Sequence, residues 1–368
     1  LLNRSQITAE EKSLKKCNFF IVTVPTPIGK NKIPNLKHII SAFKTISKNI
    51  KKNDIVFLES TVFPGTTENI CKKIIKKKKK AKIKIGYSSE RINPGDKIHN
   101  IRNINKVVAI KENKKIISKV KKVYNCISKK IILSENIKEA ELSKLIENTQ
   151  RDLNIALINE LSVIFSKLNI DTLEVLEAAG TKWNFLPFRP GMVGGHCISV
   201  DPYYLTYKAQ MAGYNPEVIL AGRRINENMS RYAAQQIIKK MINNKISISS
   251  SRIAVLGLTF KENCPDFRNT KILDIIDELQ NWGVEVVVGD TWAEPTSVKK
   301  RLNICLEDVT EQNDFDALIV AVSHNEYRDL TPKDLKSMCR TPNPVIGDLK
   351  SIYNKDELIN NGFDVFRL

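Results

Sequence analysis

The residues best suited to covalent chemistry lie between positions 190 and 204. Gly194 and Gly195 come just before Cys197, and Asp201 follows the cysteine by four positions. Paired glycines let a backbone adopt positive φ or approach a ligand closely. We expect Cys197 near the start of the next helix, where the helix dipole favours a thiolate, with Asp201 one turn further along the same face. A thiol beside a carboxylate predicts a covalent nucleophile with a proton acceptor.

Two other interpretations of this segment remain open. Cys197 could be a buried structural cysteine that follows a turn. A metal site is less favoured, because His196 and Cys197 are adjacent and no second pair of ligands follows at zinc spacing. We therefore expect no metal.

A second candidate pair, Lys144 and Asn148, is spaced four residues apart in an apolar-periodic stretch. That spacing puts both side chains on one face of a helix, where an ammonium and an amide can stabilise an oxyanion. Taken alone, the pair is better explained by a solvated helix face.

The third candidate segment is the loop that follows a predicted strand at residues 252–258. Gly257 opens a turn at the carboxyl end of that strand, where open α/β sheets bind ligands. Lys261 and Arg268 suit phosphate or hydroxyl-rich groups. A basic loop without a ligand is the alternative.

Strands and helices must position these candidate segments, and the hydrophobic pattern of the sequence predicts where those elements lie. Short, continuously apolar runs alternate with amphipathic stretches such as 36–50 and 66–76, which is typical of βαβ units with a parallel sheet. The strands expected in the first region are 18–24, 54–58, 83–87, 106–110 and 130–133. Those expected in the last region are 252–258, 284–290, 317–322, 345–349 and 364–368.

Between the two α/β regions the pattern is helical only. One long helix is expected over 140–168 and another over 203–241, the second with a possible break near 213–216. The fold class is therefore α/β, with two Rossmann-like parallel-sheet domains joined by a helical domain. The expected boundaries are 1–136, 137–247 and 248–368.

Composition narrows the functional class. The 368 residues include 59 Lys and Arg against 40 Asp and Glu, a net charge of +19. The lysines are spread along the chain, and the one dense run, at 76–80, is expected on a surface helix, so we do not expect nucleic-acid binding. No apolar stretch is long enough for a membrane span, and seven cysteines without paired spacing are no disulfide framework. We expect a cytoplasmic protein.

With further motifs, the chain resembles the UDP-glucose/GDP-mannose dehydrogenase family. The pattern Gly-Gly-x-Cys-x-x-x-Asp at 194–201 lies between an upstream Lys-x-x-x-Asn helix and a downstream Gly-x-x-Phe-Lys loop. Val-Pro-Thr-Pro at 24–27, Glu-Ser-Thr-Val-Phe-Pro-Gly at 59–65 and the segment 87–96 match other family motifs in order. The resemblance covers the chain from Ile21 to Leu368.

The resemblance implies oxidation of the C6 hydroxyl of a nucleotide-sugar to a carboxylate, with two NAD⁺ consumed. Cys197 would form a thiohemiacetal and then a thioester, and Lys144 and Asn148 would stabilise oxyanions. Asp201 would assist proton transfer. Glu90 would serve thioester hydrolysis, and Thr61 would help to hold the water.

It also implies binding residues and partners. Cofactor binding is assigned to Val24, Pro25, Thr26, Thr61, Lys261 and Arg268. Substrate binding is assigned to Glu90, Arg91, Lys144, Asn148, Phe188, Arg189, Gly194, Gly195 and Lys261. The middle helices would form the interface of a homodimer or higher homo-oligomer, with part of each substrate site supplied across it.

The region 188–205 is similar to the branch that acts on UDP-N-acetylhexosamines. Within it we favour UDP-N-acetylglucosamine, with the galacto and manno epimers and UDP-glucose as alternatives, and polysaccharide biosynthesis as the context.

The family's Gly-x-Gly-x-x-Gly turn is not found in the sequence. Residue 1 is Leu, so we expect the chain to be a fragment of an active dehydrogenase. The alternative is a complete, non-catalytic protein that binds a UDP-sugar and dimerises.

Overall fold

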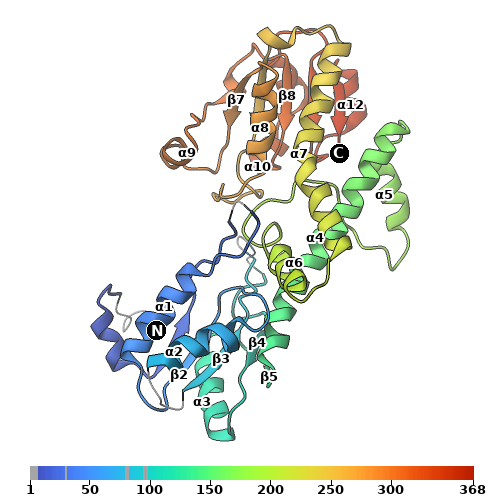
Figure 1. Ribbon diagram of the computed structural model, residues 1–368. Helices are drawn as coiled ribbons and strands as arrows, with labels where there is room; N and C mark the ends of the chain where they lie inside the picture. Colours follow the sequence, from blue (N-terminus) through green and yellow to red (C-terminus); the bar gives the residue numbers. More distant parts are fainter. Residues whose placement is uncertain (1–6, 30, 79–82, 94–95, 97) are drawn as a thin grey trace. The chain divides into compact units, whose positions relative to one another are not determined.

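A computed structural model describes residues 7–29, 31–78, 83–93, 96 and 98–368. The chain divides into two compact units, each built from two stretches of sequence. Unit 1 comprises Leu1–Thr149 and Val200–Pro216, and unit 2 comprises Gln150–Ser199 and Glu217–Leu368. Figure 1 follows the chain by colour from its blue start to its red end.

Unit 1 contains a five-stranded sheet in the order β1-β2-β3-β4-β5. Its strands are β1 (Phe19–Val22), β2 (Ile55–Leu58), β3 (Lys84–Ser88), β4 (Lys106–Ala109) and β5 (Ile131–Ser134). Its shorter helices are a 3₁₀ helix (Glu11–Lys16), α1 (Lys37–Asn49), a π-helix (Thr66–Cys71), α2 (Lys72–Lys78) and α3 (Lys114–Asn125). The expected strands are all present, with ends shifted by one or two residues. The expected basic surface run at 76–80 lies partly outside the described residues.

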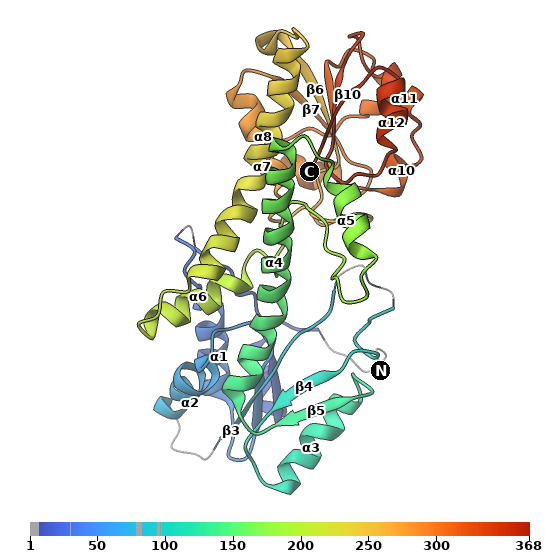
Figure 2. The ribbon, with the colours of Figure 1, turned by 90° about the vertical axis from the view of Figure 1, so that its right-hand side faces the viewer.

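Alternation of side chains along these strands builds one core on each face of the sheet. Val56, Leu58 and Tyr87 pack with α1 and α2 on one face. Phe57 and Val108 pack with α3 on the other, and Figure 2 shows α3 beside β4 and β5. Burial on both faces explains why the strands read as continuous apolar runs.

The first sheet is mixed, which the βαβ pattern did not predict. The pairs β1–β2 and β2–β3 are parallel, whereas β4 runs antiparallel to β3. β5 is parallel to β4. The amino end of β4 therefore lies at the same edge of the sheet as the carboxyl ends of β2 and β3.

Unit 2 contains a second five-stranded sheet, all parallel, in the order β10-β9-β8-β6-β7. Its strands are β6 (Arg252–Leu256), β7 (Glu285–Gly289), β8 (Ala317–Val320), β9 (Val345–Asp348) and β10 (Asp364–Arg367). Its shorter helices are α8 (Ile272–Asn281), α9 (Pro295–Leu302), α10 (Asn325–Arg328), α11 (Pro332–Ser337), α12 (Lys355–Asn360) and 3₁₀ turns at Ile248–Ser250 and Val309–Glu311. The strand order reverses between β6 and β8, the position where such sheets bind ligands.

Between β5 and β6 the described chain is helical. Its α-helices are α4 (Ile137–Lys167), α5 (Thr172–Gly180), α6 (Asp201–Met211) and α7 (Glu217–Asn243), of which α4 and α7 are the longest. The expected break near 213–216 is confirmed, because α6 ends at Met211 and α7 starts at Glu217. In unit 2, α7 and α8 cover one face of the sheet and α10, α11 and α12 the other. No helix among the described residues is both long enough and apolar enough to span a bilayer.

Candidate active site

A buried polar cluster joins α4 to the first residue of α6 in unit 1. Asn148 Nδ2 donates to Asp201 Oδ2 at 2.6 Å, and Lys144 Nζ lies 3.9 Å from the same oxygen. Lys144, Asn148 and Asp201 are 7%, 4% and 2% exposed. The shared helix face predicted for Lys144 and Asn148 is confirmed, and the solvated-face alternative is wrong.

The electrostatics of this cluster favour proton transfer. Burial raises the pKa of Asp201 to about 6, against the lowering effects of the Lys144 charge and the Asn148 hydrogen bond. Glu147 adds a smaller raising effect. A carboxylate with a pKa close to neutral pH can both accept and return a proton during turnover.

The loop after β3 carries Glu90, whose carboxylate accepts two backbone hydrogen bonds at one oxygen. Its Oε1 accepts hydrogen bonds of 2.7 Å from the backbone N–H groups of Arg91 and Ile92. Arg91 pairs with Glu147 on α4, at 2.8 Å between NH2 and Oε1, and donates to the Asn105 carbonyl. The Glu90 side chain is 42% exposed. The loop therefore holds a solvent-accessible carboxylate that is tied to α4 through Arg91.

The segment after β2 holds Thr61, which is partly buried. The next turn is held by Glu141 of α4, which accepts hydrogen bonds from the N–H groups of Gly65 (2.5 Å) and Thr67 (2.9 Å). Gly65 has φ +90°, a conformation that glycine adopts without strain. Thr61 thus lies on a segment whose following turn is fixed by a buried carboxylate.

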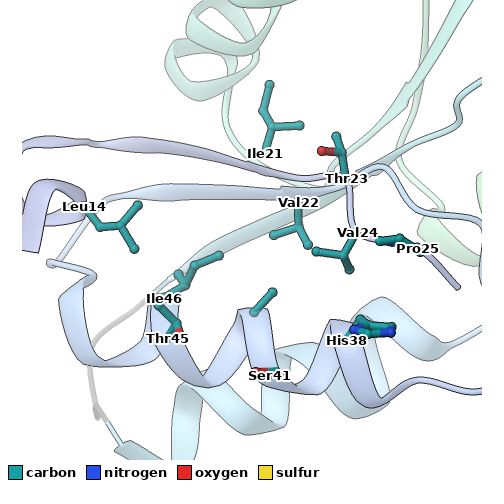
Figure 3. Close-up of a pocket in the computed structure, with 11 residues that line it drawn as sticks. Leu14, Ile21, Val22, Thr23, Val24, Pro25, His38, Ser41, Thr45 and Ile46 are labelled. Atoms are coloured by element: carbon teal, nitrogen blue, oxygen red, sulfur yellow. The ribbon is translucent and has the colours of Figure 1, made fainter. Parts of the chain in front are cut away.

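A cavity of about 470 Å³ lies beside the end of β1. Val24 and Pro25 line it, together with residues of β1 and the facing side of α1, including His38 (Figure 3). Neighbouring hydrogen bonds fix this corner, since Ser60 Oγ donates to the Val24 carbonyl and Tyr204 OH donates to the Thr26 carbonyl. Two of the predicted cofactor residues, Val24 and Pro25, therefore line a cavity.

In unit 2, Cys197 is exposed and lies in the turns before α6. The expectation that it would occupy the first turn of the helix, one turn before Asp201, is wrong, because α6 begins at Asp201. The physical reason is Pro202, which is tolerated in the first turn but would break a helix already running from Cys197. The buried-cysteine alternative is also wrong.

The glycines before the cysteine behave as predicted. Gly195 has φ +83° and its N–H donates to the Asn269 carbonyl at 3.1 Å. A Cβ on Gly195 would lie 3.1 Å from the Phe260 ring, and one on Gly194 would lie 2.8 Å from the Asn269 carbonyl oxygen. The cysteine loop therefore packs against the 257–270 loop at a distance that only glycine permits.

A buried amide fixes the start of this loop. Asn159 Oδ1 accepts from the Gly191 N–H at 2.8 Å, and Asn159 Nδ2 donates to the Gly191 carbonyl at 3.0 Å. The same Nδ2 donates to Asn226 Oδ1, and Asn226 in turn bonds Asp152. Phe188, half-buried, and Arg189, exposed, precede this anchor.

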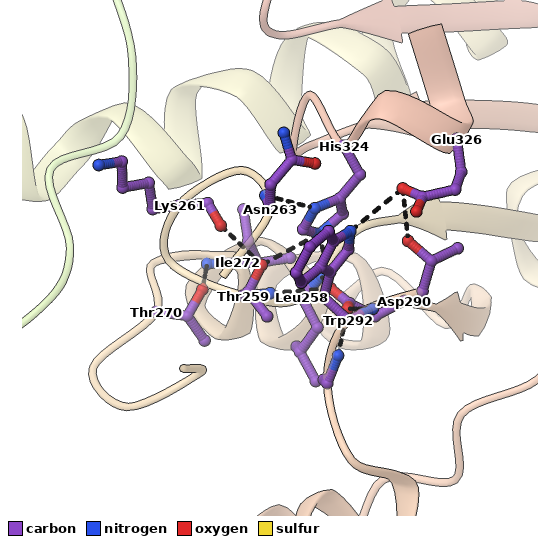
Figure 4. A network of polar contacts seen from close by, with 12 residues as sticks. Leu258, Thr259, Lys261, Asn263, Thr270, Ile272, Asp290, Trp292, His324 and Glu326 are labelled. Atoms are coloured by element: carbon purple, nitrogen blue, oxygen red, sulfur yellow. Dashed lines mark hydrogen bonds and ion pairs between the residues drawn. The ribbon is translucent and has the colours of Figure 1, made fainter. Parts of the chain in front are cut away.

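The loop after β6 is held by a second buried network (Figure 4). Asn263 N–H donates to His324 Nδ1 at 2.9 Å, so the proton of a neutral ring lies on Nε2, which faces Thr259 Oγ1 and Asp290 Oδ2. Burial favours a higher pKa for Asp290, but hydrogen bonds from His324 and from backbone N–H groups lower it to about 2.

Within this loop Gly257 has φ +100°, as the predicted turn requires. The Lys261 side chain extends away from the network in Figure 4. Arg268 is exposed and its guanidinium pairs with Asp266 at 2.6 Å. Both predicted cations therefore lie on a loop at the carboxyl end of β6.

Sequence reasoning missed several of these residues. Asp152 and Asn159 are buried on α4. Asp152 follows the buried Leu145 by seven residues, and Asn159 follows Asp152 by seven, so both polar residues lie on an apolar helix face. That pattern could have identified them. Asp290 directly follows β7, as the acidic residue of a nucleotide fold does.

Three family models match the chain in order. The NAD binding domain of the UDP-glucose/GDP-mannose dehydrogenase family matches residues 3–128, its central domain residues 138–228, and its UDP binding domain residues 254–355.

Individual proteins similar to this chain agree with the family models. A UDP-N-acetyl-D-glucosamine 6-dehydrogenase from Salmonella typhi is 47% identical over 94% of this chain and 82% of its own length. One from Pseudomonas aeruginosa is 46% identical over 94% and 83%. The solved UDP-D-ManNAc dehydrogenase from Pyrococcus horikoshii superimposes with a TM-score of 0.85 at 28% identity, covering 98% of this chain and 83% of that one. The chain is thus an NAD-dependent oxidoreductase that belongs to the UDP-glucose/GDP-mannose dehydrogenase family.

Proposed function

We propose that the protein oxidises the C6 hydroxyl of UDP-N-acetylglucosamine to a carboxylate. The balanced reaction converts R–CH₂OH, two NAD⁺ and one water into R–COO⁻, two NADH and three protons. The identity to two UDP-N-acetyl-D-glucosamine 6-dehydrogenases supports this sugar over its epimers.

The observation that carries the reaction class is the buried cluster of Lys144, Asn148 and Asp201. An ammonium and an amide aimed at one small volume stabilise an oxygen that becomes negatively charged. Asp201, with its raised pKa of about 6, accepts the hydroxyl proton as the C6 hydrogen leaves as hydride. A site of that composition serves alcohol oxidation and the later tetrahedral intermediates equally well.

Cys197 is the nucleophile in this proposal. Its sulfur adds to the aldehyde carbon to give a thiohemiacetal, whose oxidation leaves a thioester on Sγ. Glu90 then accepts a proton from the attacking water, which Thr61 helps to orient. The exposure of Cys197 and the open side of the Glu90 carboxylate support these roles, since both must meet substrate or water.

NAD supplies the hydride acceptor. We assign its binding to Val24, Pro25, Thr26 and Thr61 in unit 1. The cavity beside β1 fits a flat ring of such a cofactor, because its walls are mostly apolar with a few hydroxyls and one imidazole. Lys261 and Arg268, also assigned to cofactor binding from the sequence, lie in the span that matches the UDP binding domain. That match favours the substrate nucleotide as their ligand.

The remaining substrate contacts are assigned to Arg91, Phe188, Arg189, Gly194 and Gly195. Their positions in the Glu90 loop and the Cys197 loop support this assignment. We also propose that domain boundaries follow residues 136 and 247. Polysaccharide biosynthesis is the proposed pathway in which the enzyme acts.

A homodimer formed through the middle helices belongs to the same proposal. On α4, Leu157 and Ile164 are 54% and 44% exposed and are spaced by seven residues, which puts them on one helix face. Leu168, which directly follows the helix, is 59% exposed. An apolar stripe of this kind favours packing against a second helix.

The test is the stoichiometry of the purified protein with four sugars: UDP-N-acetylglucosamine, its galacto and manno epimers, and UDP-glucose. We expect two NADH per UDP-N-acetylglucosamine consumed, with the acid as product, and a higher kcat/KM than for the other three. Cys197→Ser should form no acid. One NADH per sugar with released aldehyde, or full turnover by Cys197→Ser, would refute the mechanism. A higher kcat/KM for another sugar would refute the substrate.

A further inference from the structure

A buried lysine outside the predicted site touches the hydrolytic carboxylate. Lys106, the first residue of β4, is 2% exposed. Its Nζ lies 3.0 Å from Glu59 Oε2 and 3.6 Å from Glu90 Oε2. A buried ammonium is costly unless carboxylates compensate it, and here one ammonium is shared by two.

The topology of the sheet explains this position. β4 is antiparallel to β3, with Tyr87 opposite Ala109 and Ser88 opposite Val108. Continuing that register by two residues places Glu90 opposite Lys106. Glu59 follows directly after β2, the parallel neighbour of β3. The reversed strand thus brings a cation to the edge where the parallel strands end.

The Glu90 carboxylate is therefore held from two sides. Backbone N–H groups of Arg91 and Ile92 bind Oε1, and the Lys106 ammonium attracts Oε2. Its side chain is nevertheless 42% exposed, so water has access to it. A base with a fixed orientation and one open side is what proton abstraction from water requires.

Among the residues that the structure describes, Lys106 is paired with both the Glu59 and the Glu90 carboxylates. Glu59 is 8% exposed. The pKa of Tyr124 is raised well above its usual value, first by the burial of Tyr124 and second by the negative charge of Glu59. Without the Lys106 ammonium, the Glu59 and Glu90 carboxylates would face one another with no cation between them. Two carboxylates that share one ammonium repel each other once its charge is removed, so Glu90 would turn away from Glu59.

We propose that Lys106 is a positioning residue for the hydrolytic half of the reaction, holding Glu90 Oε2 toward the attacking water. This inference rests on the function proposed above. In that step the water oxygen bonds to the thioester carbon, and one water proton passes to Glu90. The C–S bond breaks with its electron pair on Cys197 Sγ, and Glu90 returns the proton to solvent.

The experiment compares Lys106→Met with the unaltered protein. Lys84→Met is the matched control, since Lys84 is also buried at the start of a strand of this sheet but donates to Asn53 and contacts neither carboxylate. Rapid mixing with NAD⁺ and UDP-N-acetylglucosamine gives the NADH burst, and acid quenching with mass spectrometry gives the fraction of acylated Cys197. Thermal unfolding monitors folding.

For Lys106→Met we expect a burst of two NADH per site, an unchanged KM for the sugar, accumulation of the acylated cysteine and a kcat lowered about tenfold or more. Lys84→Met should hydrolyse the thioester at the unaltered rate. Lys106→Gln, which keeps a hydrogen-bond donor without the charge, should accumulate the same acyl species, and it replaces Lys106→Met if that variant does not fold.

Hydrolysis at the unaltered rate in either folded Lys106 variant overturns the proposal. So does a loss of burst and hydrolysis in equal measure, since that result indicates a purely structural ion pair with Glu59. Failure of the unaltered protein to form two NADH per sugar would instead refute the proposed function.

Discussion

Asp201 offers a quantitative test of the buried cluster, because its carboxyl has different surroundings in the folded and unfolded chain. Burial raises its pKa from 3.8 to about 6 in the folded protein. The native state therefore binds more protons than the unfolded state between these two values. Stability supplied by the protonated carboxyl is fully present below pH 3.8 and is lost as the pH rises through about 6.

The size of the effect follows from the shift. About two pKa units correspond to about 3 kcal/mol at 25 °C, and roughly half of this falls between pH 5 and pH 7. Asp201→Asn keeps a hydrogen-bonding group but cannot titrate. The free energy of unfolding of the unaltered protein should therefore fall by about 1 kcal/mol, relative to that of the variant, between pH 5 and pH 7.

Urea unfolding of both proteins at several pH values measures this difference, and other titrating groups cancel in it. The same pKa predicts that kcat/KM declines as the pH falls below about 6, because a protonated Asp201 cannot accept the hydroxyl proton. A flat difference in unfolding free energy across this range would refute the assigned environment of Asp201. A rate that rises below pH 6 would refute its role as proton acceptor.

Two further predictions concern the loop that carries Cys197. Asn159→Leu leaves the Gly191 N–H and carbonyl without their buried partner, so urea unfolding should show a free energy of unfolding lower by about 2–4 kcal/mol. The control is Asn154→Ala, which removes a less buried amide on the same helix and should change that free energy by under about 0.5 kcal/mol. Equal losses in the two variants would contradict the anchoring role of Asn159. Gly195→Ala forces a Cβ toward the Phe260 ring at φ +83°, so thermal unfolding should show a destabilisation of about 1–2 kcal/mol, and an unchanged midpoint would contradict the close approach.

Local patterns in the sequence were enough to predict the elements. Continuous apolar runs identified the buried strands, and a four-residue spacing put Lys144 and Asn148 on one helix face. Gly257 was expected in a turn, and it has the positive φ that a turn of this kind requires. Each of these inferences depends only on residues within a few positions of one another, where backbone geometry is regular.

Local patterns misplaced Cys197, although the needed signal was present. The four-residue spacing from Cys197 to Asp201 predicts one helical turn, but the helix begins only at Asp201, because Pro202 is tolerated in a first turn and not further inside a helix. The error came from applying periodicity across a helix boundary.

The sequence by itself determined the fold class and the family motifs, and it supplied the candidate reactive groups. Only the tertiary structure decided which groups meet and how far they are buried. Asp201 accepts from Asn148 across 53 positions of sequence, and its raised pKa is a consequence of burial that no local pattern encodes. Lys106 meets Glu90 because β4 runs antiparallel to β3. Strand direction is set by which faces can be buried together, and that choice depends on the whole chain.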